Sequence, residues 1–179
     1  MNSFPSIHKS VIIEIENGIQ IPSDAHIEAG TIISMGKDSS LKIGKRVTIY
    51  PGVIIRCRKG IIEIGDDVSI GPGVNIYEMR GGLRIGNHSL IAGGVAICGV
   101  NHGFRDIDTP IREQPTQDQC VTIGKNVWIG MNTVINPGVV IGNHSIIGSG
   151  SVVTRDIPEF SVAYGSPCKR IRDRRSTDD

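Results

Sequence analysis

The sequence predicts an all-β fold, a single-stranded parallel β-helix of about six coils. Three observations predict it: an aliphatic residue recurs at every sixth position, glycine is abundant with 23 residues, and aromatic residues make up only 4% of the chain. A period of six fits neither an amphipathic helix nor a half-buried strand. A short strand followed by a turn, repeated three times per coil, accounts for it, because tight corners favour glycine and a narrow core has little room for rings.

The ladder of aliphatic residues has eighteen rungs, seventeen of them isoleucine. If each coil has three faces, three rungs make one coil. The three rungs of each coil are Ile21, Ile27, Ile33; Ile43, Ile49, Ile55; Ile64, Ile70, Ile76; Ile85, Ile91, Ile97; Ile123, Ile129, Ile135; and Ile141, Ile147, Val153. Counted from the rung as the first position, the fifth position of each hexapeptide is small or β-branched and the second is often glycine. Residues that favour turns therefore lie beside residues that favour a buried strand.

Irregular spacing between coils predicts where the chain leaves the solenoid. Successive coils start 22, 21, 21, 38 and 18 residues apart. The spacing of 38 exceeds the regular 18 by twenty, so we expect one coil to extrude a loop over about 99–121. We further expect residues 1–20 to cap the first coil, residues 21–157 to form the solenoid, and residues 158–179 to form a C-terminal extension with a frayed tail.

Composition argues against several classes of function. A net charge of +1 gives no general reason to bind nucleic acid, and no apolar run approaches the length of a membrane span, so we expect no stable membrane insertion. The four cysteines form no Cys-x-x-Cys pair. Scattered thiols fit a reducing compartment, so we expect a cytoplasmic protein.

One of the five histidines stands apart from the repeat. His88 and His144 occupy matching Ile-Gly-Asn-His-Ser corners, where a histidine is an ordinary solvent-facing residue. His102 instead lies five residues after Ile97, where the extruded loop leaves its coil. It is therefore the histidine with a candidate functional position.

Residues 121–172 resemble the C-terminal half of the hexapeptide-repeat acyltransferases, and most closely the galactoside, maltose and nodulation-factor O-acetyltransferases. The segments that carry the resemblance are Ile123–Gly130 (IGKNVWIG), Ile135–Gly138 (INPG), Gly148–Pro158 (GSGSVVTRDIP) and Gly165–Lys169 (GSPCK). The resemblance implies a left-handed β-helix, a homotrimer with active sites between adjacent subunits, and acetyl-CoA as the donor. It also implies a hydroxyl of a sugar or polysaccharide unit as the acceptor.

The same resemblance implies that His102 is the catalytic residue. An imidazole with a pKa near 6.5 can take the proton of a hydroxyl as that hydroxyl attacks a thioester, and can return a proton to the leaving thiol. A second group has to fix the tautomer of the imidazole. Glu78, Asp106 and a backbone carbonyl are the alternatives, of which we favour the carbonyl.

The resemblance also assigns the two binding sites. Asn75, Tyr77 and Glu78, one coil before His102, are the candidates for acceptor contacts. The donor would lie along the later coils, and no metal is expected. The candidate donor contacts are Trp128 and Met131 near the thiol, Ser149 on the pantetheine arm, Thr154 and Arg155 further along, and Lys169 and Arg172 at the phosphates.

Three other functions compete with this reading. The acceptor could be the amine of an amino sugar, which would make the protein an N-acetyltransferase. A non-catalytic hexapeptide scaffold is the second alternative, although it would need neither the loop nor the basic C-terminal motif. A zinc enzyme of the γ-carbonic anhydrase type would need a histidine five residues after His102, and position 107 is isoleucine.

Overall fold

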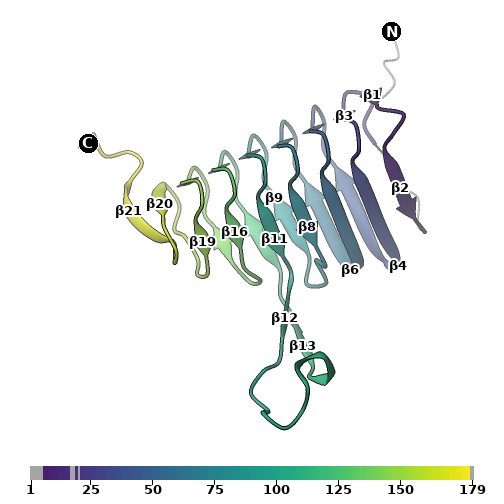
Figure 1. Cartoon of the computed structure of the whole chain (residues 1–179). Coiled ribbons are helices and arrows are strands. Elements are labelled where there is room, and N and C mark those ends of the chain that lie inside the picture. The colour runs from purple at the N-terminus through teal and green to yellow at the C-terminus, as the bar shows by residue number, and fades with distance from the viewer. Residues whose placement is uncertain (1–5, 17–18, 20, 178–179) are drawn as a thin grey trace.

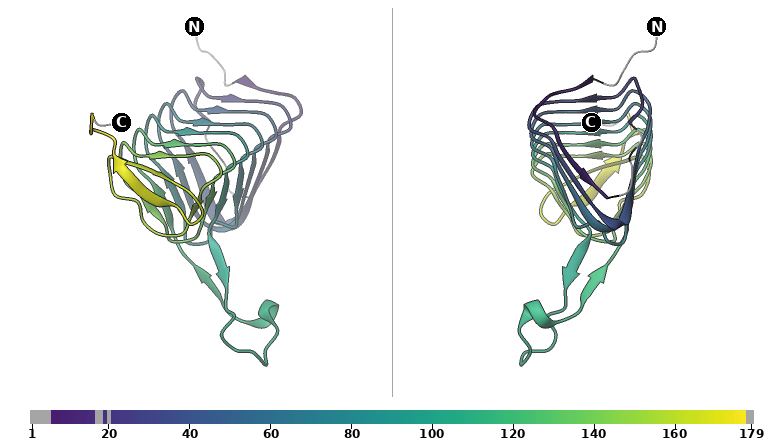
Figure 2. Two further views of the ribbon diagram at one scale, coloured as in Figure 1. Left: turned by 60° about the vertical axis from the view of Figure 1, so that its left-hand side comes forward. Right: turned by 90° about the vertical axis from the view of Figure 1, so that its right-hand side faces the viewer.

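The computed structural model describes residues 6–16, 19 and 21–177, and its fold is a stack of parallel coils, as the ladder predicts. Figure 1 shows the coils lying side by side from the N-terminal to the C-terminal end, and the end-on view in Figure 2 shows the three faces of the prism. The predicted all-β parallel solenoid is confirmed. Strands of neighbouring coils pair with their rungs in register, for example Ile91 with Ile129, Ile97 with Ile135 and Ile123 with Ile141.

The first face is a nine-stranded sheet, which is parallel except at its C-terminal edge. There β21 (Lys169–Asp173) runs antiparallel to β20 (Ser161–Tyr164). The other strands of this face are β1 (Ser6–Ile7), β3 (His26–Ile27), β5 (Thr48–Ile49), β7 (Ser69–Ile70), β10 (Leu90–Ile91), β15 (Trp128–Ile129) and β18 (Ile146–Ile147).

The second and third faces are joined because two long strands, β4 (Ile32–Ile43) and β6 (Ile54–Ile64), pass from one face to the other. The residues by which the first two coils exceed eighteen lie in these strands, whereas those of the third coil lie in a turn at residues 80–82. The rest of the second face consists of β2 (Ile12–Ile15), β8 (Asn75–Tyr77), β11 (Ala96–Cys98), β16 (Val134–Ile135) and β19 (Val152–Val153). The rest of the third face consists of β9 (Leu83–Ile85), β14 (Val121–Ile123) and β17 (Val140–Ile141).

The core is the column of aliphatic rungs inside the prism. Every rung from Ile27 to Val153 is buried, and Ile21 packs partly against the column. Most buried hydroxyls at the corners form a hydrogen bond to the neighbouring coil. Ser89, for example, donates to the carbonyl of Gly124 and accepts from the amide of Val127. Burying an isoleucine contributes about 1.5–3 kcal/mol, so the ladder is the main source of stability.

Parallel pairing extends beyond residues 21–157 at both ends. Ile7 pairs with Ile27 through β1, and Ile13 pairs with Ile33 through β2. At the other end, Ala163 continues the column below Ile147. The tail is attached as far as the arginines that follow β21: the amide of Arg174 donates to Phe160, and the guanidinium of Arg175 lies 4.2 Å from the centre of the Phe160 ring.

The predicted loop is a two-stranded arm that projects from the corner between the second and third faces (Figure 1). Its strands β12 (Val100–His102) and β13 (Thr116–Asp118) pair antiparallel, and a short 3-10 helix, η1 (Ile111–Glu113), lies near the tip. The arm is anchored on both sides because Gln119 donates to the carbonyl of Gly99 where the two strands meet the solenoid.

Candidate active site

His102 lies at the end of β12, on the exposed surface of the arm. Its partner in the register is Thr116 on β13. Backbone hydrogen bonds flank this pair, from Gly103 to the carbonyl of Pro115 and from Gln119 to the carbonyl of Gly99. His102 and Thr116 are therefore a non-hydrogen-bonded pair, the kind in which opposing side chains of an antiparallel ladder lie closest.

A cavity of about 450 Å³ surrounds this part of the arm. Its walls carry the imidazole, a guanidinium, an aromatic ring and amide side chains, and such groups suit a polyhydroxylated ligand. The residues lining it are His102, Gly103, Phe104, Arg105, Asp106, Gln114, Pro115, Thr116 and Gln117.

The tip of the arm is ordered by its own polar side chains. The Asp106 carboxylate accepts from the hydroxyl of Thr109 and from the amide of Asp108, and these hydrogen bonds hold the pKa of Asp106 below its usual value. The buried Gln114 donates to the carbonyls of Asp106 and Thr109. Asp106, one of the alternatives for orienting the imidazole, is thus engaged within the tip.

Two of the three acceptor candidates lie on the outer surface of the second face. Asn75 and Tyr77 are exposed residues of β8, on either side of the buried rung Ile76. Tyr77 pairs with Cys98 in the next coil, one residue before the arm begins. Both side chains are therefore available to a ligand near the root of the arm.

Glu78, the third acceptor candidate, is buried, with 4% of its surface exposed. Its carboxylate lies between two guanidiniums: Oε1 is 3.5 Å from Nε of Arg58, and Oε2 is 3.3 Å from Nε of Arg80. The sequence did contain a signal for this burial. Met35 and Cys57, which also follow their rungs by two residues on this face, are buried as well.

Five of the donor candidates lie on or beside the first face. Trp128 is half exposed on β15, between Leu90 and Ile146 of the neighbouring coils. Met131 and Ser149 are exposed at the corner that follows this face, where Gly150 donates to the carbonyl of Met131. Lys169 and Arg172 are exposed on β21, at the C-terminal edge of the same sheet.

Thr154 and Arg155 lie elsewhere, at the end of the second face, on the corner from which the arm branches two coils earlier. The structure of a single chain therefore divides the candidates into two groups. His102, Asn75 and Tyr77 lie around the second face and the arm, together with Thr154 and Arg155. The other group occupies the first face and its following corner: Trp128, Met131, Ser149, Lys169 and Arg172.

The cations near the C-terminus differ in whether they have a partner. Arg170 and Arg175 both pair with Asp173. Within the described part of the chain, neither Lys169 nor Arg172 forms an ion pair or a side-chain hydrogen bond. These two side chains fit an anionic group, because their charges are not already neutralised.

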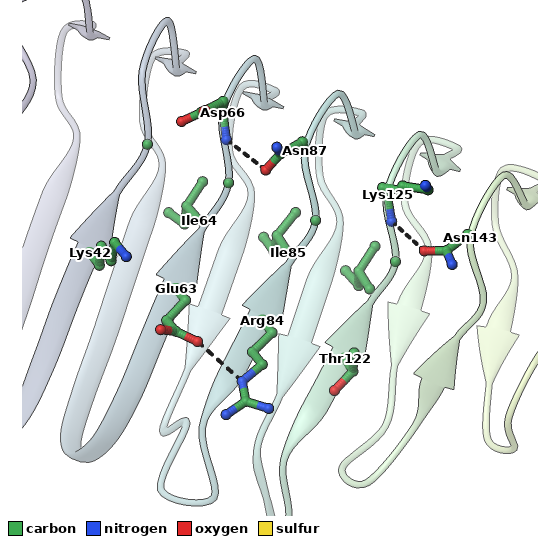
Figure 3. Close-up of a pocket in the computed structure, with 15 residues that line it drawn as sticks. Lys42, Glu63, Ile64, Asp66, Arg84, Ile85, Asn87, Thr122, Lys125 and Asn143 are labelled. Carbon is green, nitrogen blue, oxygen red and sulfur yellow. Dashed lines mark hydrogen bonds and ion pairs between the residues drawn. The ribbon is translucent and has the colours of Figure 1, made fainter.

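A separate cavity of about 630 Å³ lies on the third face, away from all of these candidates (Figure 3). Its outer residues include the ion pair of Glu63 and Arg84, 3.1 Å apart. Its corner is built by side-chain oxygens that accept backbone amides of the preceding coil: Asn87 accepts from Asp66, and Asn143 accepts from Lys125. These contacts connect successive coils.

The described residues hold neither a metal-binding cluster nor a membrane-spanning helix. They contain no cluster of three or more histidine, cysteine, aspartate or glutamate side chains arranged to hold a metal ion. No helix in the same residues has the length and apolar character needed to cross a membrane.

Comparison with known proteins agrees with the fold and the motif string. The family model described as bacterial transferase hexapeptide (six repeats) matches residues 120–155. The galactoside O-acetyltransferase of Escherichia coli is 44% identical over 58 residues, which are 32% of this chain and 29% of that protein. The Mycobacterium tuberculosis protein named "Probable acetyltransferase Rv3034c" is 34% identical over 78 residues, 44% of this chain and 26% of its own length.

Solved structures extend the similarity beyond the matched motifs. A maltose O-acetyltransferase from Clostridium difficile is 31% identical with a TM-score of 0.64, over 74% of this chain and 68% of that one. The N-acyltransferase AntD from Bacillus cereus, in complex with dTDP-4-amino-4,6-dideoxyglucose and coenzyme A, has a TM-score of 0.66 at 22% identity, over 80% and 81% of the two chains. The second similarity concerns the fold alone.

A parallel solenoid with an extruded arm and this motif string defines a hexapeptide-repeat transferase. The chain belongs to the hexapeptide-repeat acyltransferase family. The alignments to the two curated relatives span 26% and 29% of their lengths.

Proposed function

We propose that the protein is an acetyl-CoA-dependent O-acetyltransferase that acetylates a hydroxyl of a sugar or polysaccharide unit, with His102 as the general base. The observation that carries the proposal is the place of His102: an exposed imidazole on an arm built out of the solenoid, in a cavity with Arg105, Phe104 and Gln117. The membership of the chain in the acyltransferase family supports the reaction type.

In this proposal the imidazole of His102 accepts the proton of the acceptor hydroxyl while the hydroxyl oxygen attacks the thioester carbonyl carbon. The carbon–sulfur bond breaks as the new ester forms. The imidazolium returns its proton to the sulfur of the departing thiol. General base catalysis of this kind contributes roughly 10²–10⁴-fold to the rate.

The donor would bind on the first face of the solenoid. Acetyl-CoA would lie against Trp128, Met131 and Ser149, with its phosphates at Lys169 and Arg172. The half-exposed Trp128 and Met131 provide apolar contact area, and the two unpaired cations provide charge-assisted hydrogen bonds. AntD was solved with coenzyme A, so a fold of the same kind can hold the coenzyme.

The candidate catalytic, acceptor and donor residues lie in two separate parts of one chain, which supports a site shared between subunits. We propose that the arm of one subunit faces the first face of another in a homotrimer. His102, Asn75 and Tyr77 would then meet the thiol end of a donor that is held mainly by the neighbouring chain.

Acetyl-CoA binding by titration calorimetry tests the proposal without knowledge of the acceptor. Saturable binding in the micromolar range, at one site per subunit, is the expected result and would lead to a screen of sugars beginning with maltose and galactosides. An amino sugar belongs in the same screen, because acetylation of its nitrogen would favour the N-acetyltransferase. Absence of binding at millimolar acetyl-CoA would contradict the acyltransferase assignment.

A further inference from the structure

The corner directly beneath the arm, residues 78–82, supports both of its strands. Gly99, where the arm leaves, stacks so closely that a Cβ atom there would lie 2.7 Å from the carbonyl oxygen of Glu78. On the returning side, a Cβ atom on Gly81 would lie 2.6 Å from the amide nitrogen of Cys120. Val121 donates to the carbonyl of Gly82. The position of this corner therefore sets the position of the arm.

Glu78 fixes the corner with a buried charge. It has a φ angle of +49°, its amide donates to the carbonyl of Arg56, and its carboxylate is held by Arg58 and Arg80. A buried carboxylate without such partners is strongly unfavourable, so the two guanidiniums and the carboxylate hold one another in place.

Arg80 connects this buried carboxylate to the arm. Its Nε faces Glu78, while its Nη1 donates to the hydroxyl of Thr116 at 3.4 Å. Thr116 is the residue directly opposite His102 in the arm. A planar guanidinium can serve both partners at once because its donors point in fixed directions.

We infer that Glu78 is a positioning residue that acts through Arg80 and Thr116 to fix the arm, and with it the imidazole of His102. This inference rests on the proposed function, since it assigns the arm its role in catalysis. Glu78 itself does not contact the acceptor. Loss of this connection leaves the solenoid folded and lets the arm move, which misplaces the imidazole.

Hydrogen exchange of the arm tests the inference independently of any activity. In Glu78→Gln and in Thr116→Val, the amides of β12 and β13 are expected to exchange about tenfold faster or more, whereas those of β15 and β16 do not change. Thr116→Ser retains the hydroxyl and should restore slow exchange. Glu63→Gln removes an exposed carboxylate–arginine pair of the same solenoid and is the matched control.

Turnover supplies the second measurement, by thiol release from acetyl-CoA with maltose or a galactoside. Glu78→Gln and Thr116→Val are expected to lower kcat by about 10–10²-fold with little change in KM for acetyl-CoA. Unchanged exchange in both variants would overturn the inference whatever the activity. Faster exchange with unchanged kcat would overturn it as well, because the arm would then not position a catalytic group. Failure of the wild-type protein to bind or turn over acetyl-CoA would instead count against the proposed function.

Discussion

Nε of Arg80 lies 3.3 Å from Oε2 of Glu78, and the same guanidinium reaches the hydroxyl of Thr116 in the arm. The carboxylate is buried, whereas Arg80 remains about one-third exposed. An ion pair in the wall of the solenoid thus gives polar support to the strand pair that carries His102. The ion pair and the hydrogen bond from Arg80 to Thr116 connect the coils to the projecting arm at this point.

Substitution of a rung is expected to destabilise the solenoid strongly. Ile129 is fully buried, so Ile129→Ala should lower the free energy of unfolding by about 2–5 kcal/mol, through lost burial and the cavity that remains. Val140→Ala, at a position 42% exposed, is the control and should cost about 0.5 kcal/mol or less. Urea denaturation followed by circular dichroism measures both. Equal effects of the two substitutions would contradict the assignment of the ladder as the core.

Removal of the unpaired C-terminal cations is expected to weaken donor binding. Lys169→Ala or Arg172→Ala should each raise the Kd for acetyl-CoA by about tenfold at low salt, since each loses a charge-assisted contact with a phosphate. The difference should shrink at high ionic strength. Arg175→Ala, which removes a cation already paired with Asp173, is the control and should leave the Kd unchanged. If both Lys169→Ala and Arg172→Ala bind as the wild type does, the phosphates lie elsewhere.

The C-terminal edge is expected to lose stability in acid. Hydrogen bonds from the side chain and the amide of Arg175 hold the pKa of Asp173 well below its ordinary value, and the charges of Arg175 and Arg170 act in the same direction. A lowered pKa means that the folded state favours the carboxylate. The stabilisation is therefore complete above the ordinary carboxyl pKa and is lost as the pH falls through the lowered one.

Comparison of the wild type with Asp173→Asn measures this contribution. The variant should melt at a lower temperature near neutral pH, and the difference should shrink as the pH falls below about 4. A difference that stays constant or grows in acid would show that the carboxylate is not the stabilising form.

The periodicity of the sequence was sufficient to predict the solenoid and the place where a loop leaves it, but not the strand pair that this loop forms. A six-residue spacing fixes which side chains point inward, and Ile27 and Val153 are buried for the same reason. The spacing does not determine the shape of the corners. The extra residues at 58–60, which the spacing places at a corner, belong to the long strand β6.

The candidate site was predictable in part. His102 could be singled out because it breaks the pattern of His88 and His144, both of which lie at tight corners with positive φ angles. The role of Glu78 could not be read in the same way. Its burial follows from its position two residues after a rung, but its two arginine partners depend on how neighbouring corners stack, which spacing alone does not specify.

The turnover of His102→Ala is the measurement that shows whether this imidazole is the general base. Acetyl transfer to the best sugar of the screen is measured by thiol release, and acetyl-CoA binding by calorimetry. If His102 is the general base, turnover falls by roughly 10²–10⁴-fold, while folding and the Kd for acetyl-CoA stay nearly unchanged. A His102→Ala protein with full activity would contradict this role and remove His102 from the mechanism.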